Sequence, residues 1–88
     1  MKYYLPSKPT LREATLEVMK KEKDMISVPE MNQKVYDYLK LPDEVIFMED
    51  DNGLDNAIDY RMRWVRTELK KEGILINPAR GFWKYNKG

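Results

Sequence analysis

Five basic side chains in the last third of the chain have the types and spacing to do chemistry, and that chemistry is anion binding. Arg63, Arg66 and Lys70 recur at intervals of three and four residues, which places them along one side of a helix. Arg80 and Lys84 follow within a predicted hairpin. Duplex DNA binds cations that displace its condensed counterions, and its major groove admits a helix. The pattern predicts a nucleic-acid-binding surface, with simple surface solubility as the alternative explanation of these charges.

One helix and one hairpin must position these cations. We expect the helix over residues 55–72, because its last turn is basic and Gly73 follows, as is typical of a helix C-terminus. Residues 74–77 and 82–85 are rich in β-formers and flank a turn at residues 78–81 that contains glycine. A basic helix that leads directly into a basic hairpin is typical of the end of a winged helix-turn-helix.

The earlier part of the chain predicts the remaining elements of that fold. Thr10 and Glu13 form a potential capping box for a helix over residues 10–23. Residues 25–28 indicate a short strand or linker, and Pro29 suits the first turn of a helix over residues 29–39. Further helical turns are expected over residues 42–46, and an acidic loop over residues 49–53.

The predicted fold class is mainly α with a small β-hairpin, a winged helix-turn-helix. It has a three-helix core, a short extra helix and a C-terminal wing. We expect a single domain over residues 1–88, divided into an extended arm (1–9), a helical core (10–73) and a wing hairpin (74–86). The arm is expected to lie against the domain surface, with insertion into a DNA groove as the alternative.

Charge is distributed unevenly along the chain. The formal net charge is +1 overall, but residues 41–60 contain seven acidic groups and no basic group. Residues 61–88 contain eight basic and two acidic groups. This asymmetry predicts an anionic partner for the C-terminal third, which the neighbouring acidic segment would oppose.

The composition excludes several classes of function. Cysteine and histidine are both absent, which excludes disulfides, thiolate nucleophiles, zinc fingers and histidine bases. No apolar run is long enough to span a bilayer and no signal peptide opens the chain, so we expect a cytoplasmic protein. An acidic pattern at residues 50–59 resembles a calcium loop, but its first ligand position would be Met48, so no metal site is predicted.

Three further features of the long helix and hairpin have two readings each. Asp59 either accepts a hydrogen bond from a cytosine amino group or pairs with Arg63. Arg61 falls on the apolar side of the helix, where it either extends along the core edge or pairs with an acid of residues 43–51. The aromatic side chains Trp64, Phe82 and Trp83 are interpreted as core residues, with base stacking as the alternative.

Several of these residues together resemble a known family. The run Arg61-x-x-Trp64-Val65-x-x-x-Leu69-Lys70-x-x-Gly73-Ile74-Leu75, followed by Arg80-Gly81-x-Trp83, is similar to the N-terminal domain of Mrr-type restriction proteins. The chain departs from that pattern at Asp59–Tyr60, where the family often has a basic residue and an asparagine, and at Glu72, where it has an alanine.

The resemblance implies a winged-helix DNA-binding module, which in the family precedes a nuclease domain that cleaves modified DNA. Nothing in these residues supplies such a nuclease, and we expect no enzymatic activity and no cofactor. The predicted partner is double-stranded DNA. The alternative is a protein-interaction module of the same fold, in which the basic third of one molecule meets the acidic segment of another. No membrane or small-molecule partner is expected.

Overall fold

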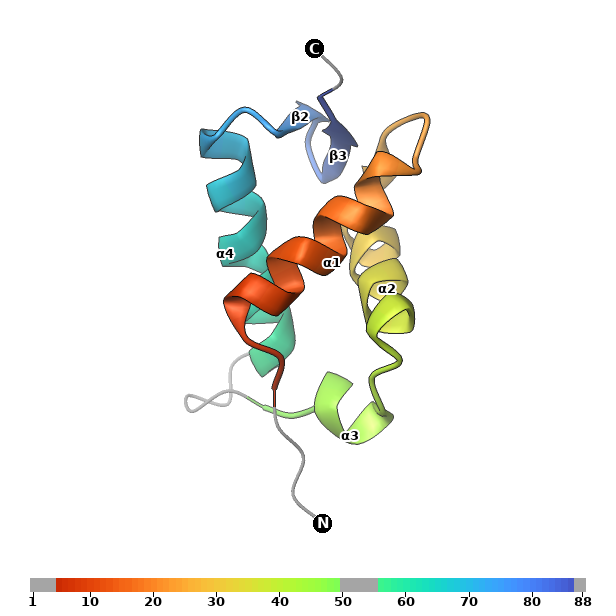
Figure 1. Ribbon diagram of the computed structural model, residues 1–88, viewed down its shortest axis with the longest axis vertical. Coiled ribbons are helices and arrows are strands. Elements are labelled where there is room, and N and C mark those ends of the chain that lie inside the picture. The colour runs from red at the N-terminus through yellow and green to blue at the C-terminus, as the bar shows by residue number, and fades with distance from the viewer. Residues whose placement is uncertain (1–4, 50–55, 87–88) are drawn as a thin grey trace.

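The computed structural model describes residues 5–49 and 56–86, whose elements follow the order of a winged helix-turn-helix (Figure 1). The elements are α1 (Lys8–Lys20), β1 (Ile26–Ser27), α2 (Val28–Leu39), α3 (Asp43–Ile46), α4 (Ala57–Lys71), β2 (Leu75–Ala79) and β3 (Phe82–Tyr85). The predicted fold class is confirmed by the four helices and the small antiparallel sheet of the described part. The predictions for residues 1–4 and 50–55, including the start of the long helix at Asp55, lie outside the described residues.

The three longer helices surround the core, and the sheet closes one end of it. Figure 1 shows α1 crossing between α4 and α2, with α3 at the end opposite the sheet. The fully buried apolar side chains include Leu11, Met19, Met31, Val35, Ile58, Met62, Val65, Leu69 and Leu75. Complete burial of an aliphatic side chain of this size stabilises the fold by about 1.5–3 kcal/mol. Each helix contributes to this core through one apolar face, as the helical periodicity of the sequence predicts.

Helix α1 begins earlier than its predicted start at Thr10. The Ser7 side chain accepts a hydrogen bond from the Thr10 backbone N–H at 3.4 Å, so Ser7 caps the helix and Thr10 lies within the first turn. Pro9 is compatible with this position because the first turn of a helix needs no hydrogen bond from its N–H groups. The arm before the helix is therefore shorter than the sequence predicts.

Arginine and glutamate side chains attach α1 to the end of α4. Arg12 donates two hydrogen bonds to Glu72, with Nη1–Oε2 and Nη2–Oε1 distances of 2.5 and 2.6 Å. The hydrogen bond from Arg12 is the main reason why the pKa of Glu72 lies below its ordinary value. Lys8 Nζ lies 3.1 Å from Glu68 Oε1 on the same side of the two helices. Glu72, which departs from the family pattern, thus joins two helices.

Two helices end in the same left-handed cap, although the capping residues differ. After α4, Gly73 has a φ of 78°, and the N–H groups of Gly73 and Ile74 donate to the carbonyls of Lys70 and Leu69 at 3.0 Å each. After α2, Lys40 has a φ of 54° and the corresponding two hydrogen bonds are present. Glycine adopts this conformation without steric cost and lysine does not. The cap on α4 turns the chain into the wing.

The wing is the β2–β3 hairpin, and β3 is also paired with β1. Pro78 and Ala79 continue β2, so the turn consists of Arg80 and Gly81 and is shorter than the predicted residues 78–81. The register shifts between Ile76 and Ala79, which marks a bulge that accommodates Pro78. The Asn77 side-chain amide crosses this bulge and donates to the carbonyls of Ala79 and Phe82.

Candidate nucleic-acid interface

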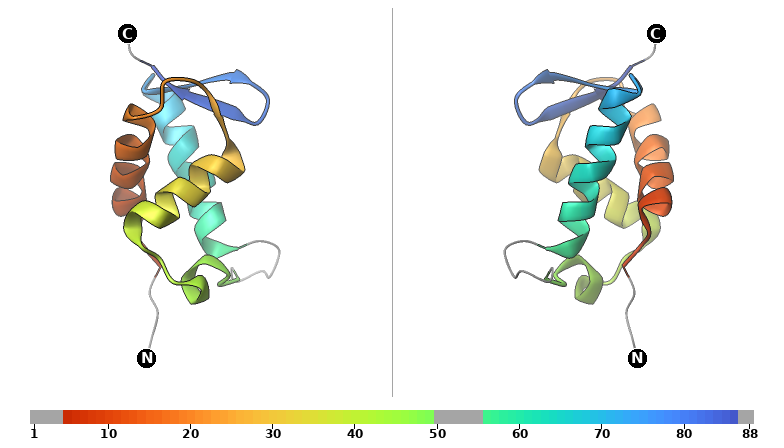
Figure 2. Two further views of the ribbon diagram at one scale, coloured as in Figure 1. Left: turned by 90° about the vertical axis from the view of Figure 1, so that its right-hand side faces the viewer. Right: turned by 90° about the vertical axis from the view of Figure 1, so that its left-hand side faces the viewer.

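The exposed face of α4 differs from the cationic stripe that the sequence predicts. Six side chains of α4 are exposed: Tyr60, Arg63, Trp64, Thr67, Lys70 and Lys71. Arg66 is only 9% exposed, because its side of α4 faces α2, which crosses α4 in Figure 2. The predicted row of Arg63, Arg66 and Lys70 is therefore divided between solvent and a helix junction. Thr67 lies at the centre of the exposed face.

Arg66 is held against α2 by a neutral partner. Its Nη1 donates a hydrogen bond to Asn32 Oδ1 at 3.1 Å. Burial is the main cause of a lowered pKa for Arg66, and the nearby charge of Arg63 lowers this pKa further. An arginine side chain remains protonated in proteins, so the junction of α2 and α4 contains a positive charge that is largely removed from solvent.

Arg66 lines a small open cavity, which we call the α2–α4 notch. Its volume is about 420 Å³, and its walls include Val28, Pro29, Asn32, Asp59, Arg63 and Arg66. Asp59 brings a carboxylate into the notch and accepts a hydrogen bond from the Tyr36 hydroxyl group. Arg63 and Arg66 thus lie in one cavity, as their spacing predicts, but Asp59 lies there with them.

The wing turn lies beside the same notch. The Val28 N–H donates a hydrogen bond to the Gly81 carbonyl at 3.0 Å, which joins the turn to the first residue of α2. Arg80, the other turn residue, is exposed. The hairpin extends away from α1 and over the start of α2 (Figure 2). Three of the five predicted cations, Arg63, Arg66 and Arg80, are therefore placed around one junction.

The other two predicted cations lie further along the same elements. Lys70 is exposed near the end of α4. Lys84 is paired with Ile76 across the hairpin, whereas the neighbouring Trp83 and Tyr85 pack against the core. Because side chains alternate along a strand, Lys84 points to the outer face of the sheet. It does not line the notch.

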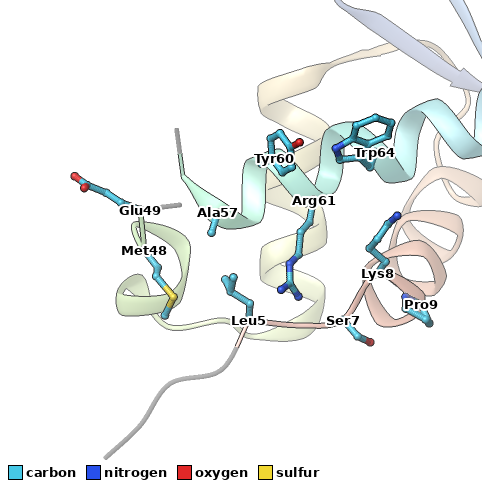
Figure 3. Close-up of a pocket in the computed structure, with 10 residues that line it drawn as sticks. All are labelled: Leu5, Ser7, Lys8, Pro9, Met48, Glu49, Ala57, Tyr60, Arg61 and Trp64. Carbon is cyan, nitrogen blue, oxygen red and sulfur yellow. The ribbon is translucent and has the colours of Figure 1, made fainter. Parts of the chain in front are cut away.

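A second depression, the arm groove, lies on the opposite side of α4 (Figure 3). It has a volume of about 950 Å³, and Leu5, Lys8, Met48, Tyr60, Arg61 and Trp64 contribute to its walls. Figure 3 shows Arg61 extending from α4 towards the arm, where its Nη1 donates to the Pro6 carbonyl at 2.8 Å. Neither predicted role of Arg61 describes this contact, because the partner is a backbone group of the arm.

The core interpretation of the aromatic residues holds for Trp83 alone. Trp64 is 46% exposed and Phe82 is 39% exposed, so that prediction is wrong for both. Trp64 packs edge-to-face on Tyr60, with 6.3 Å between ring centroids, and Lys8 Nζ lies 6.0 Å from the Trp64 ring centroid. The arm groove therefore has an aromatic wall with a cation beside it.

Sequence reasoning missed Asn32, Thr67 and Lys71 as members of this surface. Periodicity within α4 contains a signal for both Thr67 and Lys71, because Thr67 lies close to Arg63 around the helix and Lys71 lies close to Thr67. No local pattern identifies Asn32, which belongs to another helix. Among residues 5–49 and 56–86, no group of three or more acidic side chains could hold a metal ion. No helix in the same residues is long and apolar enough to cross a membrane.

Comparison with protein families identifies one that covers almost the entire chain. The model of the Mrr N-terminal domain matches residues 9–87. Comparisons with curated proteins and with solved structures found no match. The matched region contains every element of the described fold from α1 to β3, except for Lys8, the first residue of α1. The chain therefore belongs to the Mrr N-terminal domain family.

Proposed function

We propose that this domain binds double-stranded DNA through the face where the α2–α4 notch meets the wing turn. One observation carries the proposal: Arg63, Arg66 and Arg80, from α4 and the hairpin, gather at the start of α2. A cluster of cations from two structural elements can neutralise phosphates that lie several nucleotides apart on a duplex. Membership of a family associated with restriction proteins supports the same conclusion.

In this proposal α4 is the element that approaches the major groove. Lys70 extends the cationic surface along α4, and Lys84 extends it over the outer face of the wing. Asp59 opposes phosphate close to the start of α4, so we expect phosphate contacts from Arg63 onwards along α4 and on the wing. The domain acts by binding alone, without catalysis, and a cytoplasmic location would give it access to DNA.

The test is the salt dependence of binding to a short fluorescent duplex of random sequence. Five phosphate contacts predict a slope of about −4.5 in a plot of log K against log salt concentration. Affinity should then fall by about 500-fold between about 50 and 200 mM salt. Absence of binding at the lower salt concentration would refute the proposal, as would a slope close to zero.

A substitution in the wing turn tests the surface itself. Arg80→Ala should weaken binding to all sequences and reduce the magnitude of the salt slope by about one unit. Lys20→Gln is the matched control, because it removes an exposed positive charge from α1, the helix from which the wing extends away. Equal effects of the two substitutions would show that net charge alone governs binding.

A second candidate function is self-association, which the exposed aromatic wall of the arm groove favours. Tyr60 and Trp64 are both more than two-fifths exposed, at 44% and 46%. Aromatic residues of this kind are enriched in protein–protein interfaces. Light scattering across the same salt range would detect a dimer, which we expect Trp64→Ala to weaken and DNA to leave intact. A monomer under all conditions would refute this candidate.

A further inference from the structure

Arg66 carries a nearly buried positive charge that makes no direct ion pair within the described part of the chain, although the charge of Asp59 acts on it at longer range. Its one hydrogen bond there is to the neutral amide of Asn32. No Asp or Glu oxygen of residues 5–49 and 56–86 lies within 4.0 Å of its guanidinium group. Buried charges are ordinarily paired. A bound anion would therefore stabilise the positive charge of this arginine.

The remaining donors of Arg66 open into the α2–α4 notch. A guanidinium group has five N–H donors, and Asn32 accepts from Nη1 alone. Among the described residues, no buried side-chain nitrogen or oxygen lacks a hydrogen-bond partner. The other nitrogens of Arg66 must therefore reach solvent, and the cavity that this side chain lines is the notch. Its hydrogen bond to Asn32 fixes the orientation in which these donors are presented.

Other groups in the notch make the charge balance positive. Arg63 lines it beside Arg66 and lies close enough to lower the pKa of Arg66. Gln33 adds a side-chain amide, and Asp59 adds a carboxylate to which the Tyr36 hydroxyl group donates. Among the described residues that line the notch, two guanidinium groups stand against one carboxylate, and this balance favours an anion.

We propose that the α2–α4 notch is a binding site for one phosphate group, with Arg66 as the orienting donor and Arg63 as the second cation. The planar fork of a guanidinium group suits two oxygens of a phosphate. The notch volume of about 420 Å³ exceeds many times the ~30 Å³ share of a water molecule, so a phosphate fits with bridging waters. A DNA backbone phosphate and free inorganic phosphate share this chemistry. For the DNA source, the inference rests on the proposed function.

The experiment is a titration of the labelled protein with inorganic phosphate against chloride at matched ionic strength, followed by NMR. The Arg66 Nε–H and the Asn32 side-chain amide should shift with a saturable dependence on phosphate. Arg66→Gln should abolish the shift at Asn32. Lys20→Gln, which removes an exposed cation of α1 that does not line the notch, should preserve it. No saturable shift in the wild-type protein, or a shift that survives Arg66→Gln, would overturn the proposal.

A second variant keeps the test decisive if Arg66→Gln does not fold. Asn32→Asp places a carboxylate where Arg66 now donates to an amide oxygen. This carboxylate would neutralise the charge of Arg66 in place of a bound phosphate. The melting temperature should rise, and the phosphate-dependent shift at Arg66 should disappear. A variant that is destabilised and still binds phosphate with unchanged affinity would contradict the inferred site.

A parallel titration with a short duplex separates this inference from the proposed function. Phosphate-dependent shifts at the notch without duplex binding would support the notch, assign it to free phosphate and refute DNA binding. Duplex binding without a shift at Asn32 or Arg66 in either titration would refute the notch and support DNA binding. Shifts at the same two signals in both titrations would support a DNA backbone phosphate as the ligand.

Discussion

The two left-handed helix caps predict opposite effects on stability when their residues are exchanged. Gly73 after α4 and Lys40 after α2 have φ values of 78° and 54° and accompany the same pair of hydrogen bonds. The left-handed conformation costs an L-residue roughly 1–2 kcal/mol. Gly73→Ala should therefore destabilise the fold, whereas Lys40→Gly should stabilise it.

The magnitude follows from the space around each site. A Cβ atom at Gly73 would meet nothing within 4 Å, so the cost of Gly73→Ala is backbone strain alone. Alanine also lowers the conformational entropy of the unfolded chain, which offsets about 0.4–1 kcal/mol of this strain. The net loss should be about 1 kcal/mol, and Lys40→Gly should gain roughly 0.5–1 kcal/mol by the same reasoning.

Urea unfolding followed by circular dichroism would measure both effects. A change of 1 kcal/mol corresponds to a shift of about 4–8 °C in melting temperature for a domain of this size. Lys71→Ala, in the last turn of α4, is the control and should change stability by less than about 0.5 kcal/mol. Unchanged stability of Gly73→Ala, or a loss on Lys40→Gly, would refute the account of the caps.

Three further predictions concern contacts that hold the helices and the wing. Because the pKa of Glu72 is lowered, its pairing with Arg12 stabilises the fold above the unfolded-chain pKa of about 4.3 and ceases to do so as the pH falls through the folded-state pKa. Melting curves of the wild type and Glu72→Gln should differ at neutral pH and converge in acid, while Glu13→Gln should show no such convergence. Leu69→Ala should cost about 2–5 kcal/mol by urea unfolding, since Leu69 is fully buried, and a loss below about 1 kcal/mol would contradict its central position. Asn77→Asp should weaken amide protection in the wing more than Asn77→Ala, because a carboxylate would face two carbonyl oxygens; equal hydrogen exchange in the two variants would exclude this role.

Local features of the sequence determined the elements of this protein. Helical periodicity identified α4. Gly73 indicated its end, because a helix cap depends only on the last helical turn and the residue that follows it. The β-forming runs identified the hairpin, although the bulge at Pro78 shortened its turn. The basic residues were visible as types and spacings, since a charge pattern along a helix needs no knowledge of its neighbours.

The tertiary structure alone decided which of these residues face solvent. Arg66 lies at the boundary between the apolar and polar sides of α4, so its exposure depends on where α2 crosses. Trp64 lies at the opposite boundary and is exposed because α1 packs beside it without covering it. Arg12 and Glu72 are 60 residues apart in sequence, and no local pattern connects them. Contacts between elements depend on how helices pack, which periodicity within one helix does not encode.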